Sequence, residues 1–282
     1  MALNKAITLR MFPVTMPTLR RLELARDAGF TGVEINLEPW QEYTLDTGDP
    51  ELADLRRRVE RLGMVVTAVY DREQWHFPMS SIRPATRDRC ATIIRRLIHA
   101  ATVLGADTVL IMPGAVDNGI LAPQPEITPY ADAYRNAQAT LLALAPEAES
   151  QRVTLAAENC PGKFLISPLE FARFLDEIGS PRVRMYFDIG NVLWYGMPEH
   201  WIPVLGQRIH RVHVKDNHAS GGAVTAAPLL SGDVNWPSVR AALAALPYHS
   251  WLTAEVLPAY RHHGERLIWD TSAAMDAIFG EA

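Results

Sequence analysis

Eight short runs of β-branched and aromatic residues alternate along the chain with segments of helical spacing. The runs are four to eight residues long, and several are continuously apolar, as is typical of strands buried on both faces. They lie at residues 7–10, 32–35, 64–70, 108–111, 153–158, 183–188, 209–214 and 251–256. Strands that alternate with helices form parallel β-α-β units, and eight such units predict a closed (β/α)₈ TIM barrel of the α/β class.

The segments between these runs carry apolar residues at spacings of three or four. Leu52, Leu55 and Val59 show this pattern, and Gly105 ends a long apolar helix. Helices are expected at residues 19–25, 52–62, 90–104, 130–148, 168–178, 198–205, 236–246 and 266–278. Residues 216–231, which include Ser220-Gly221-Gly222, are expected to form a loop that closes over a ligand.

The chain length fits one barrel. It has 282 residues, and a (β/α)₈ barrel normally takes about 250. Because no Pro/Gly/Ser-rich linker or change in charge divides the chain, we predict a single domain over residues 1–282. The alternative is an open Rossmann-type sheet, which the absence of a GxGxxG motif after the first strand disfavours.

The composition excludes several classes of protein. With 48% hydrophobic and 21% charged residues, the chain has enough apolar surface to fold. A net charge of -5 disfavours a nucleic-acid partner. Cys90 and Cys160 are expected to be reduced thiols. Neither a signal peptide nor a membrane span of about 18 apolar residues is apparent, so we predict a cytoplasmic protein, and a homo-oligomer (dimer or tetramer) because such barrels commonly associate.

Polar residues stand at the carboxyl ends of the last four predicted strands. They are Glu158, Asp188, His213 and Glu255. Each alone has an ordinary explanation, as a rim residue, an ion-pair partner or a hydrogen-bonded core histidine. Together they converge at the end of the barrel that carries the chemistry, where three carboxylates need a cation. Three oxygen donors and one nitrogen suit Mn²⁺ first, with Mg²⁺, Co²⁺ or Zn²⁺ as alternatives.

Further polar residues stand near these four in the sequence. Lys215, Asp216, Asn191 and Glu34 are predicted to contact a small-molecule substrate. The alternatives are a solvated ion pair for Lys215 and Asp216, turn formation for Asn191, and a structural ion pair for Glu34. Trp75-His76-Phe77 and Trp194-Tyr195 are expected either to cover a ligand or to pack within loops.

These motifs resemble those of the sugar phosphate isomerase/epimerase superfamily, the xylose-isomerase-like barrels. The segments that carry the resemblance are Gly29 to Glu34, Glu158-Asn159, Asp188-Ile189-Gly190-Asn191, His213-Val214-Lys215-Asp216, Gly232 to Trp236, and Glu255. The resemblance implies a divalent metal held by Glu158, Asp188, His213 and Glu255, with the two glutamates as acid and base.

The L-ribulose-5-phosphate (L-xylulose-5-phosphate) 3-epimerase branch is the most similar. Two positions depart from relatives. Asn191 stands where enzymes of free ketoses usually have histidine, and Leu230-Ser231-Gly232 stands where relatives often have Gly-Glu-Gly.

The resulting functional prediction is a metal-dependent epimerase or isomerase of a ketose or ketose phosphate, with 3-epimerisation favoured. A proton beside the carbonyl leaves one face and returns to the other through a metal-stabilised enediolate. Aldose–ketose isomerisation and keto-sugar dehydration, as in inosose dehydratase relatives, start from the same intermediate. A catalytically inactive sugar-binding barrel is the non-enzymatic alternative, and the net charge disfavours a DNA-repair endonuclease on this fold.

Overall fold

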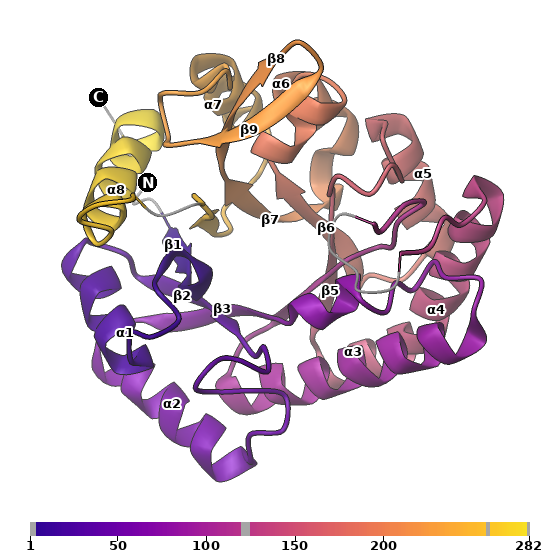
Figure 1. Cartoon of the computed structure of the whole chain (residues 1–282), viewed down its shortest axis with the longest axis horizontal. Helices are drawn as coiled ribbons and strands as arrows, with labels where there is room; N and C mark the ends of the chain where they lie inside the picture. The colour runs from indigo at the N-terminus through magenta and orange to yellow at the C-terminus, as the bar shows by residue number, and fades with distance from the viewer. Residues whose placement is uncertain (1–3, 120–124, 258–259, 281–282) are drawn as a thin grey trace.

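A computed structural model describes residues 4–119, 125–257 and 260–280. Within these residues, eight parallel strands close a barrel in the order β1-β10-β7-β6-β5-β4-β3-β2, and helices surround it (Figure 1). The strands are β1 (Lys5–Thr8), β2 (Gly32–Asn36), β3 (Val65–Tyr70), β4 (Thr108–Ile111), β5 (Thr154–Glu158), β6 (Val183–Asp188), β7 (Ile209–Val214) and β10 (Leu252–Ala254). This architecture confirms the predicted (β/α)₈ barrel.

The helices follow the strands as the apolar spacing predicted. They are α1 (Thr18–Asp27), α2 (Asp49–Arg61), α3 (Pro84–Leu104), α4 (Tyr130–Gln151), α5 (Pro168–Ile178), α6 (Pro198–Leu205), α7 (Trp236–Ala244) and α8 (Arg266–Phe279). Short 3₁₀ turns also follow some strands, among them residues Leu9–Met11 after β1 and Gly190–Trp194 after β6. These turns place side chains at the carboxyl end of the barrel.

The strand side chains form two apolar layers because successive residues point to opposite faces. Ala68 and Tyr70 of β3 belong to a cluster with Tyr186 of β6, while Val69 belongs to the larger cluster that includes the helices. The barrel interior is therefore filled by side chains, and space for a ligand is left at its end.

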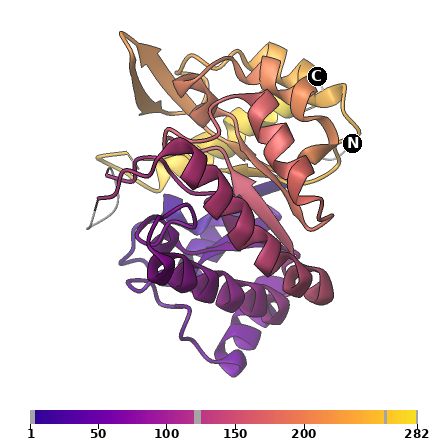
Figure 2. The same ribbon diagram turned by 90° about the vertical axis from the view of Figure 1, so that its right-hand side faces the viewer.

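The prediction of a loop over residues 216–231 is wrong in part. The chain forms an antiparallel hairpin of β8 (Asp216–Ser220) and β9 (Ala223–Ala227), which extends outward from the barrel in Figure 2. Gly221 and Gly222 form its turn with φ values of 60° and 80°, as a two-residue hairpin turn requires. The strands are short and mostly exposed, and neither Asp-Asn-His-Ala-Ser nor Ala-Val-Thr-Ala-Ala shows the regular alternation of large apolar and polar residues typical of a strand.

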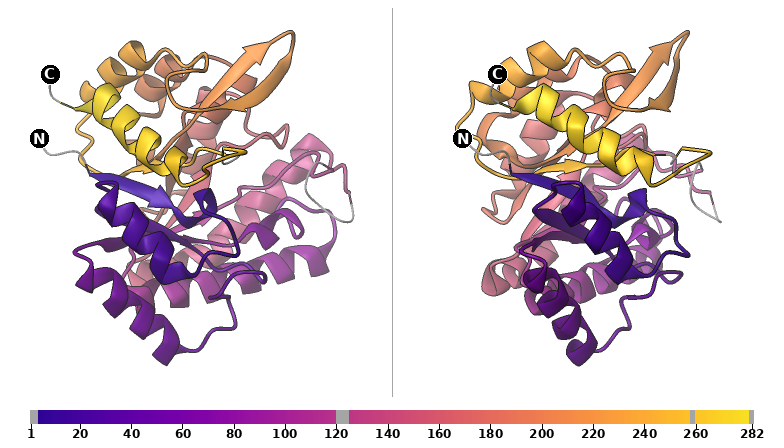
Figure 3. Two further views of the ribbon diagram at one scale, coloured as in Figure 1. Left: turned by 60° about the vertical axis from the view of Figure 1, so that its left-hand side comes forward. Right: turned by 90° about the vertical axis from the view of Figure 1, so that its left-hand side faces the viewer.

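The two ends of the chain meet where the barrel closes. Strand β1 pairs in parallel with β10, and Figure 3 shows α8 (yellow) beside β1 and α1 (indigo). Lys5 of β1 donates to Asp276 (2.7 Å) and to Ser272 (2.9 Å), both on α8. These bonds stabilise the closed ring.

Two further sequence expectations concern cysteines and membranes. Cys90 and Cys160 are buried free thiols, as expected. Over the described ranges, we find no helix whose length and apolar content would let it cross a bilayer.

His210 gives the barrel a predicted sensitivity to acid. Burial, and then the Arg211 cation, lower the pKa of His210 to about 3 against the opposing charge of Asp107. The unfolded chain, with a histidine pKa of about 6.5, binds this proton first, so stability falls as pH drops below that value. Between pH 7.5 and 5, this proton uptake should lower the unfolding free energy of the wild type by about 1–2 kcal/mol. We expect His210→Gln to lack this part of the decrease. Urea titrations at both pH values test this, and an unchanged pH slope in the variant would contradict it.

Candidate functional site

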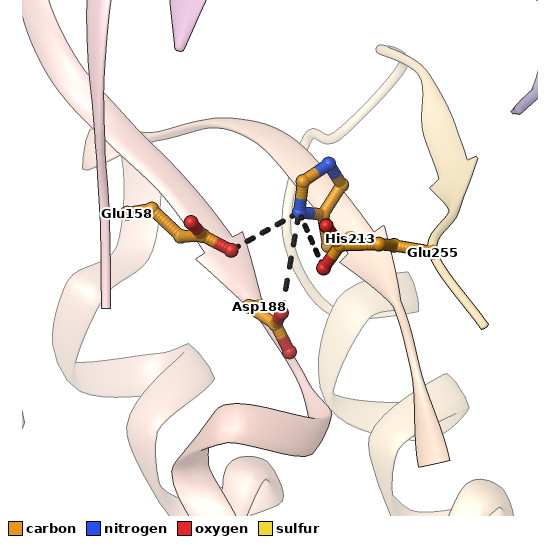
Figure 4. Close-up of side chains that lie close together, drawn as sticks. All are labelled: Glu158, Asp188, His213 and Glu255. Atoms are coloured by element: carbon orange, nitrogen blue, oxygen red, sulfur yellow. Dashed lines mark hydrogen bonds and ion pairs between the residues drawn. The ribbon is translucent and has the colours of Figure 1, made fainter. Parts of the chain in front are cut away.

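Four consecutive strands of the ring bring the predicted quartet together. Glu158 ends β5, Asp188 ends β6, His213 lies in β7, and Glu255 directly follows β10. One ligand atom from each side chain lies within 4.8 Å of the others. The His213 Nδ1 atom is 3.2 Å from Glu158, 3.6 Å from Glu255 and 4.0 Å from Asp188. In Figure 4, Glu158 and Glu255 approach from opposite sides.

The quartet concentrates negative charge in a buried place, since each of the four residues is at most 5% exposed. Burial, and then the neighbouring carboxylates Glu255 and Asp188, raise the pKa of Glu158 to about 7, although His213 opposes this. Burial disfavours a charged imidazole, but Glu255 and Glu34 outweigh it and raise the pKa of His213 well above its usual value. The site therefore favours a positive charge among its carboxylates.

The donor set fits a divalent cation. Three carboxylates and one imidazole match the hard oxygen and nitrogen ligands that Mn²⁺, Mg²⁺ and Co²⁺ accept, and their present spacing allows contraction around one ion. A four-ligand set also leaves room in an octahedral shell for substrate oxygens. The residues that would hold the ion are those predicted from the sequence.

Asp188 is oriented by its neighbours. The Asn159 side chain bonds the backbone of Asp188 in both directions, at 2.8 Å each. The backbone N–H of Asn191 donates to Asp188 Oδ1 (2.8 Å), and the Asn191 amide donates to the Asn159 carbonyl (3.0 Å). These bonds leave Asp188 Oδ2 to face His213.

Glu34 lies behind His213 and is 1% exposed. Its Oε2 atom is 3.3 Å from His213 Nε2 and accepts a hydrogen bond from Tyr186 (2.9 Å). A carboxylate at Nε2 favours the tautomer that leaves Nδ1 free for a metal. The structure thus places Glu34 against a candidate metal ligand, and its predicted contact with substrate stays a prediction.

Two cations meet at Glu255. Lys215 Nζ lies 2.9 Å from Glu255 Oε2 and 3.3 Å from Asp188 Oδ2, and Arg10 Nη1 lies 2.7 Å from Glu255 Oε1. Burial opposes ionisation, but Lys215, His213 and Arg10 hold the pKa of Glu255 well below its usual value. Electrostatically, Glu255 therefore differs strongly from Glu158.

Arg10 is a site residue that sequence reasoning missed. It follows β1 in a 3₁₀ turn, at the barrel end where the quartet lies. The available signal was a charged residue at the end of a strand, the same signal that identified the quartet. In the sequence it resembled an ordinary strand-end residue because no motif surrounded it.

Asp216 is fully buried beneath the loop before α7. Its Oδ2 accepts hydrogen bonds from the backbone N–H groups of Leu230 and Gly232 and from Trp236 Nε1, at 3.0–3.2 Å. Its Oδ1 accepts one from the Val234 N–H (3.2 Å). The structure therefore gives Asp216 a role in holding this loop, and its contact with substrate stays a prediction.

A cavity of about 150 Å³ adjoins the quartet. It is lined by Arg10, Tyr70, Trp75, Met112, Glu158, Cys160, Pro161, Asn191, Lys215 and Glu255. The lining combines charged and polar groups with aromatic and sulfur-containing side chains. This combination is typical of a small-molecule site. Of the residues predicted to contact substrate, Lys215 and Asn191 line this cavity, whereas Glu34 and Asp216 are not among its lining residues.

His213 provides a test of the metal site. We expect His213→Ala to lower affinity for Mn²⁺ by at least about tenfold, because it removes the nitrogen donor. His210→Gln, in the same strand but outside the quartet, is the matched control and should bind Mn²⁺ normally at pH 7.5. Titration calorimetry with Mn²⁺ measures both, and equal affinity in wild type and His213→Ala would exclude His213 as a ligand.

Known proteins share this architecture. A putative L-ribulose-5-phosphate 3-epimerase, SgbU of Escherichia coli K12, is 25% identical over 244 residues, which cover 84% of this chain and 82% of that protein. The D-psicose 3-epimerase structure determined with D-fructose has a TM-score of 0.80 at 14% identity, covering 99% of this chain and 100% of the other. The structure of an L-ribulose 3-epimerase has a TM-score of 0.78 at 20% identity, and the match covers 98% of this chain and 94% of the other.

The family assignment rests on a match over most of the chain. Residues 22–275, from α1 to α8, match the xylose isomerase-like TIM barrel. This range includes the whole quartet and agrees with the resemblance found in the sequence motifs. The chain belongs to the xylose isomerase-like TIM-barrel family.

Proposed function

We propose that this protein is a divalent-metal-dependent 3-epimerase of a ketose or ketose phosphate. The observation that carries the proposal is the placement of Glu158 and Glu255, which reach one cavity from opposite sides of a candidate metal site (Figure 4). Inversion at a carbon needs a proton acceptor on one face and a donor on the other. The two glutamates satisfy that requirement.

The proton would move between these carboxylates and the substrate carbon. One glutamate takes the proton from C3, and the electron pair of the C–H bond passes toward the carbonyl oxygen. The other glutamate, protonated, returns a proton to the opposite face of C3. The net result is an inverted centre with no change in composition, and the handedness of the substrate decides which glutamate acts first.

The metal's contribution would be electrostatic. Glu158, Asp188, His213 and Glu255 would hold the ion, which when bound supplies Lewis-acid stabilisation of the charge that develops beside the carbonyl. Lys215 adds a fixed positive charge at the same edge of the cavity. Trp75 and Met112, which also line the cavity, help to exclude water.

Similar proteins support this assignment. The SgbU relative is named as a 3-epimerase of L-ribulose 5-phosphate, and the two similar structures are named as 3-epimerases of D-psicose and L-ribulose. In each name the reaction is epimerisation at C3, while the sugar and its phosphorylation differ. We therefore base the proposal on the shared reaction, epimerisation at C3, and not on any one of these sugars.

Isotope exchange distinguishes epimerisation from its alternatives. We expect the Mn²⁺-loaded protein to introduce deuterium from D₂O at C3 of a ketose and to form the C3 epimer, both measured by NMR. Loss of water from the sugar would identify a dehydratase, and formation of an aldose would identify an isomerase. Absence of exchange across ketoses and ketose phosphates would refute the epimerase proposal.

Replacement of either glutamate tests the acid–base pair. Glu158→Gln and Glu255→Gln should each lower kcat by about 100- to 10,000-fold, the usual contribution of acid–base catalysis. Glu60→Gln, on the exposed surface of α2, is the matched control and should retain wild-type kcat. Circular dichroism of all three variants should match wild type. A folded variant of Glu158 or Glu255 with near-normal kcat would remove that residue from the mechanism.

A further inference from the structure

One wall of the cavity comes from the half of the barrel that contributes no quartet ligand. Tyr70 ends β3, which lies across the ring from β7, and Arg10 follows β1. The Arg10 Cζ atom lies over the Tyr70 ring, 5.6 Å from its centre, in a cation–π contact. Both line the cavity beside Glu158 and Glu255.

The Tyr70 hydroxyl has an unmet need for a hydrogen bond. Tyr70 is 1% exposed, and its hydroxyl has no partner among the residues that the structure describes. A buried polar atom without a partner is costly, so such atoms in folded proteins usually bond to water or to a ligand. Because Tyr70 lines the cavity, a molecule bound there can provide that partner.

Arg10 offers further N–H hydrogen-bond donors beside Tyr70. One of its nitrogens, Nη1, donates to Glu255, while a guanidinium carries five N–H donors. Its remaining donors can serve oxygen atoms of a ligand. Arg10 and Tyr70 together therefore offer both donors and an acceptor, the combination that sugar hydroxyl groups require.

The charge around this pair disfavours an anionic ligand. Glu38 is 3% exposed, one of its carboxylate oxygens lacks a hydrogen bond within the described ranges, and its charge helps burial to raise the pKa of Tyr70 well above the usual value. The positive charges of Arg10 and Lys215 already face Glu255 and Asp188. Arg72 lies 4.0 Å from Glu38, so a phosphate group here would compete with these carboxylates for the same cations.

One of the usual phosphate positions of such barrels, the loop after β7, is also taken. TIM barrels often bind phosphate through backbone N–H groups in the loops after the last strands. In this chain the N–H groups of Leu230, Gly232 and Val234 donate to the carboxylate of Asp216. A methyl group at Gly232 would lie 2.1 Å from Asp216, so the loop is closely fitted around this internal anion. These donors are therefore not available to a substrate phosphate.

We propose that Arg10 and Tyr70 bind the hydroxyl groups at the uncharged end of the substrate, and that the protein prefers a free ketose to the corresponding terminal phosphate. This inference rests on the proposed function for the position of the reacting end at the quartet. It adds the substrate class and two specificity residues to that function.

Binding measurements test this independently of turnover. Mn²⁺-loaded protein is titrated calorimetrically with L-ribulose, L-ribulose 5-phosphate, D-psicose and D-psicose 6-phosphate. We expect at least one free ketose to bind about tenfold or more tighter than its phosphate. Tyr70→Phe should weaken that binding by about two- to tenfold, the effect of one hydrogen bond, with kcat changed less than KM. Because the Tyr70 hydroxyl has no hydrogen-bond partner among the described residues, this variant should remain folded.

Tyr248→Phe is the matched control. The Tyr248 hydroxyl donates to the Trp251 carbonyl (2.7 Å) and does not line the cavity, so this variant should bind the ketose like wild type. The proposal is overturned if the phosphates bind as tightly as the free sugars, if Tyr70→Phe binds them all normally, or if no free ketose binds.

The D₂O experiment keeps the two proposals separate. Preferred binding of a free ketose without exchange at C3 would support the subsite and refute the epimerase. Exchange at C3 together with tighter binding of a ketose phosphate would support the epimerase and refute the subsite for a free ketose.

Discussion

Mutual repulsion among three buried carboxylates is the constraint on which the site depends. Glu158, Asp188 and Glu255 come together because the barrel directs the ends of parallel strands toward one point. Such a cluster is unfavourable unless positive charge enters it. In the structure His213, Lys215 and Arg10 supply that charge, and a divalent ion would supply it more completely.

Some residues around the quartet hold its members or the neighbouring loop in place, and others can form hydrogen bonds with a ligand. Asn159 fixes Asp188, Glu34 fixes His213, and Asp216 fixes the loop before α7. Their hydrogen-bonding capacity is largely used within the protein. Tyr70 lines the cavity and differs from them, because its hydroxyl is left without a hydrogen-bond partner in the described part of the chain. Unused polar capacity at a cavity wall is the structural mark of a binding position.

The sequence allowed the barrel and the quartet to be predicted because both follow from local patterns and a fixed direction. Parallel strands end on one side, so a polar residue at each end could be placed without knowing any distance. Glu34 and Asp216 required more, since only the folded chain shows which side of His213 or which loop they contact. No recognised motif included Arg10 or Tyr70, and the exposed hairpin β8–β9 lacked the alternation of large apolar and polar residues that predicts a strand.

A crystal structure of the Mn²⁺ complex, with anomalous data collected at the manganese edge, tests the central claim most directly. We predict one anomalous peak, from a single Mn²⁺ ion. One atom of each quartet residue, Glu158, Asp188, His213 and Glu255, should lie within about 2.0–2.4 Å of this peak. A peak elsewhere, or one that leaves Glu158 or Glu255 turned away from the ion, would contradict the account.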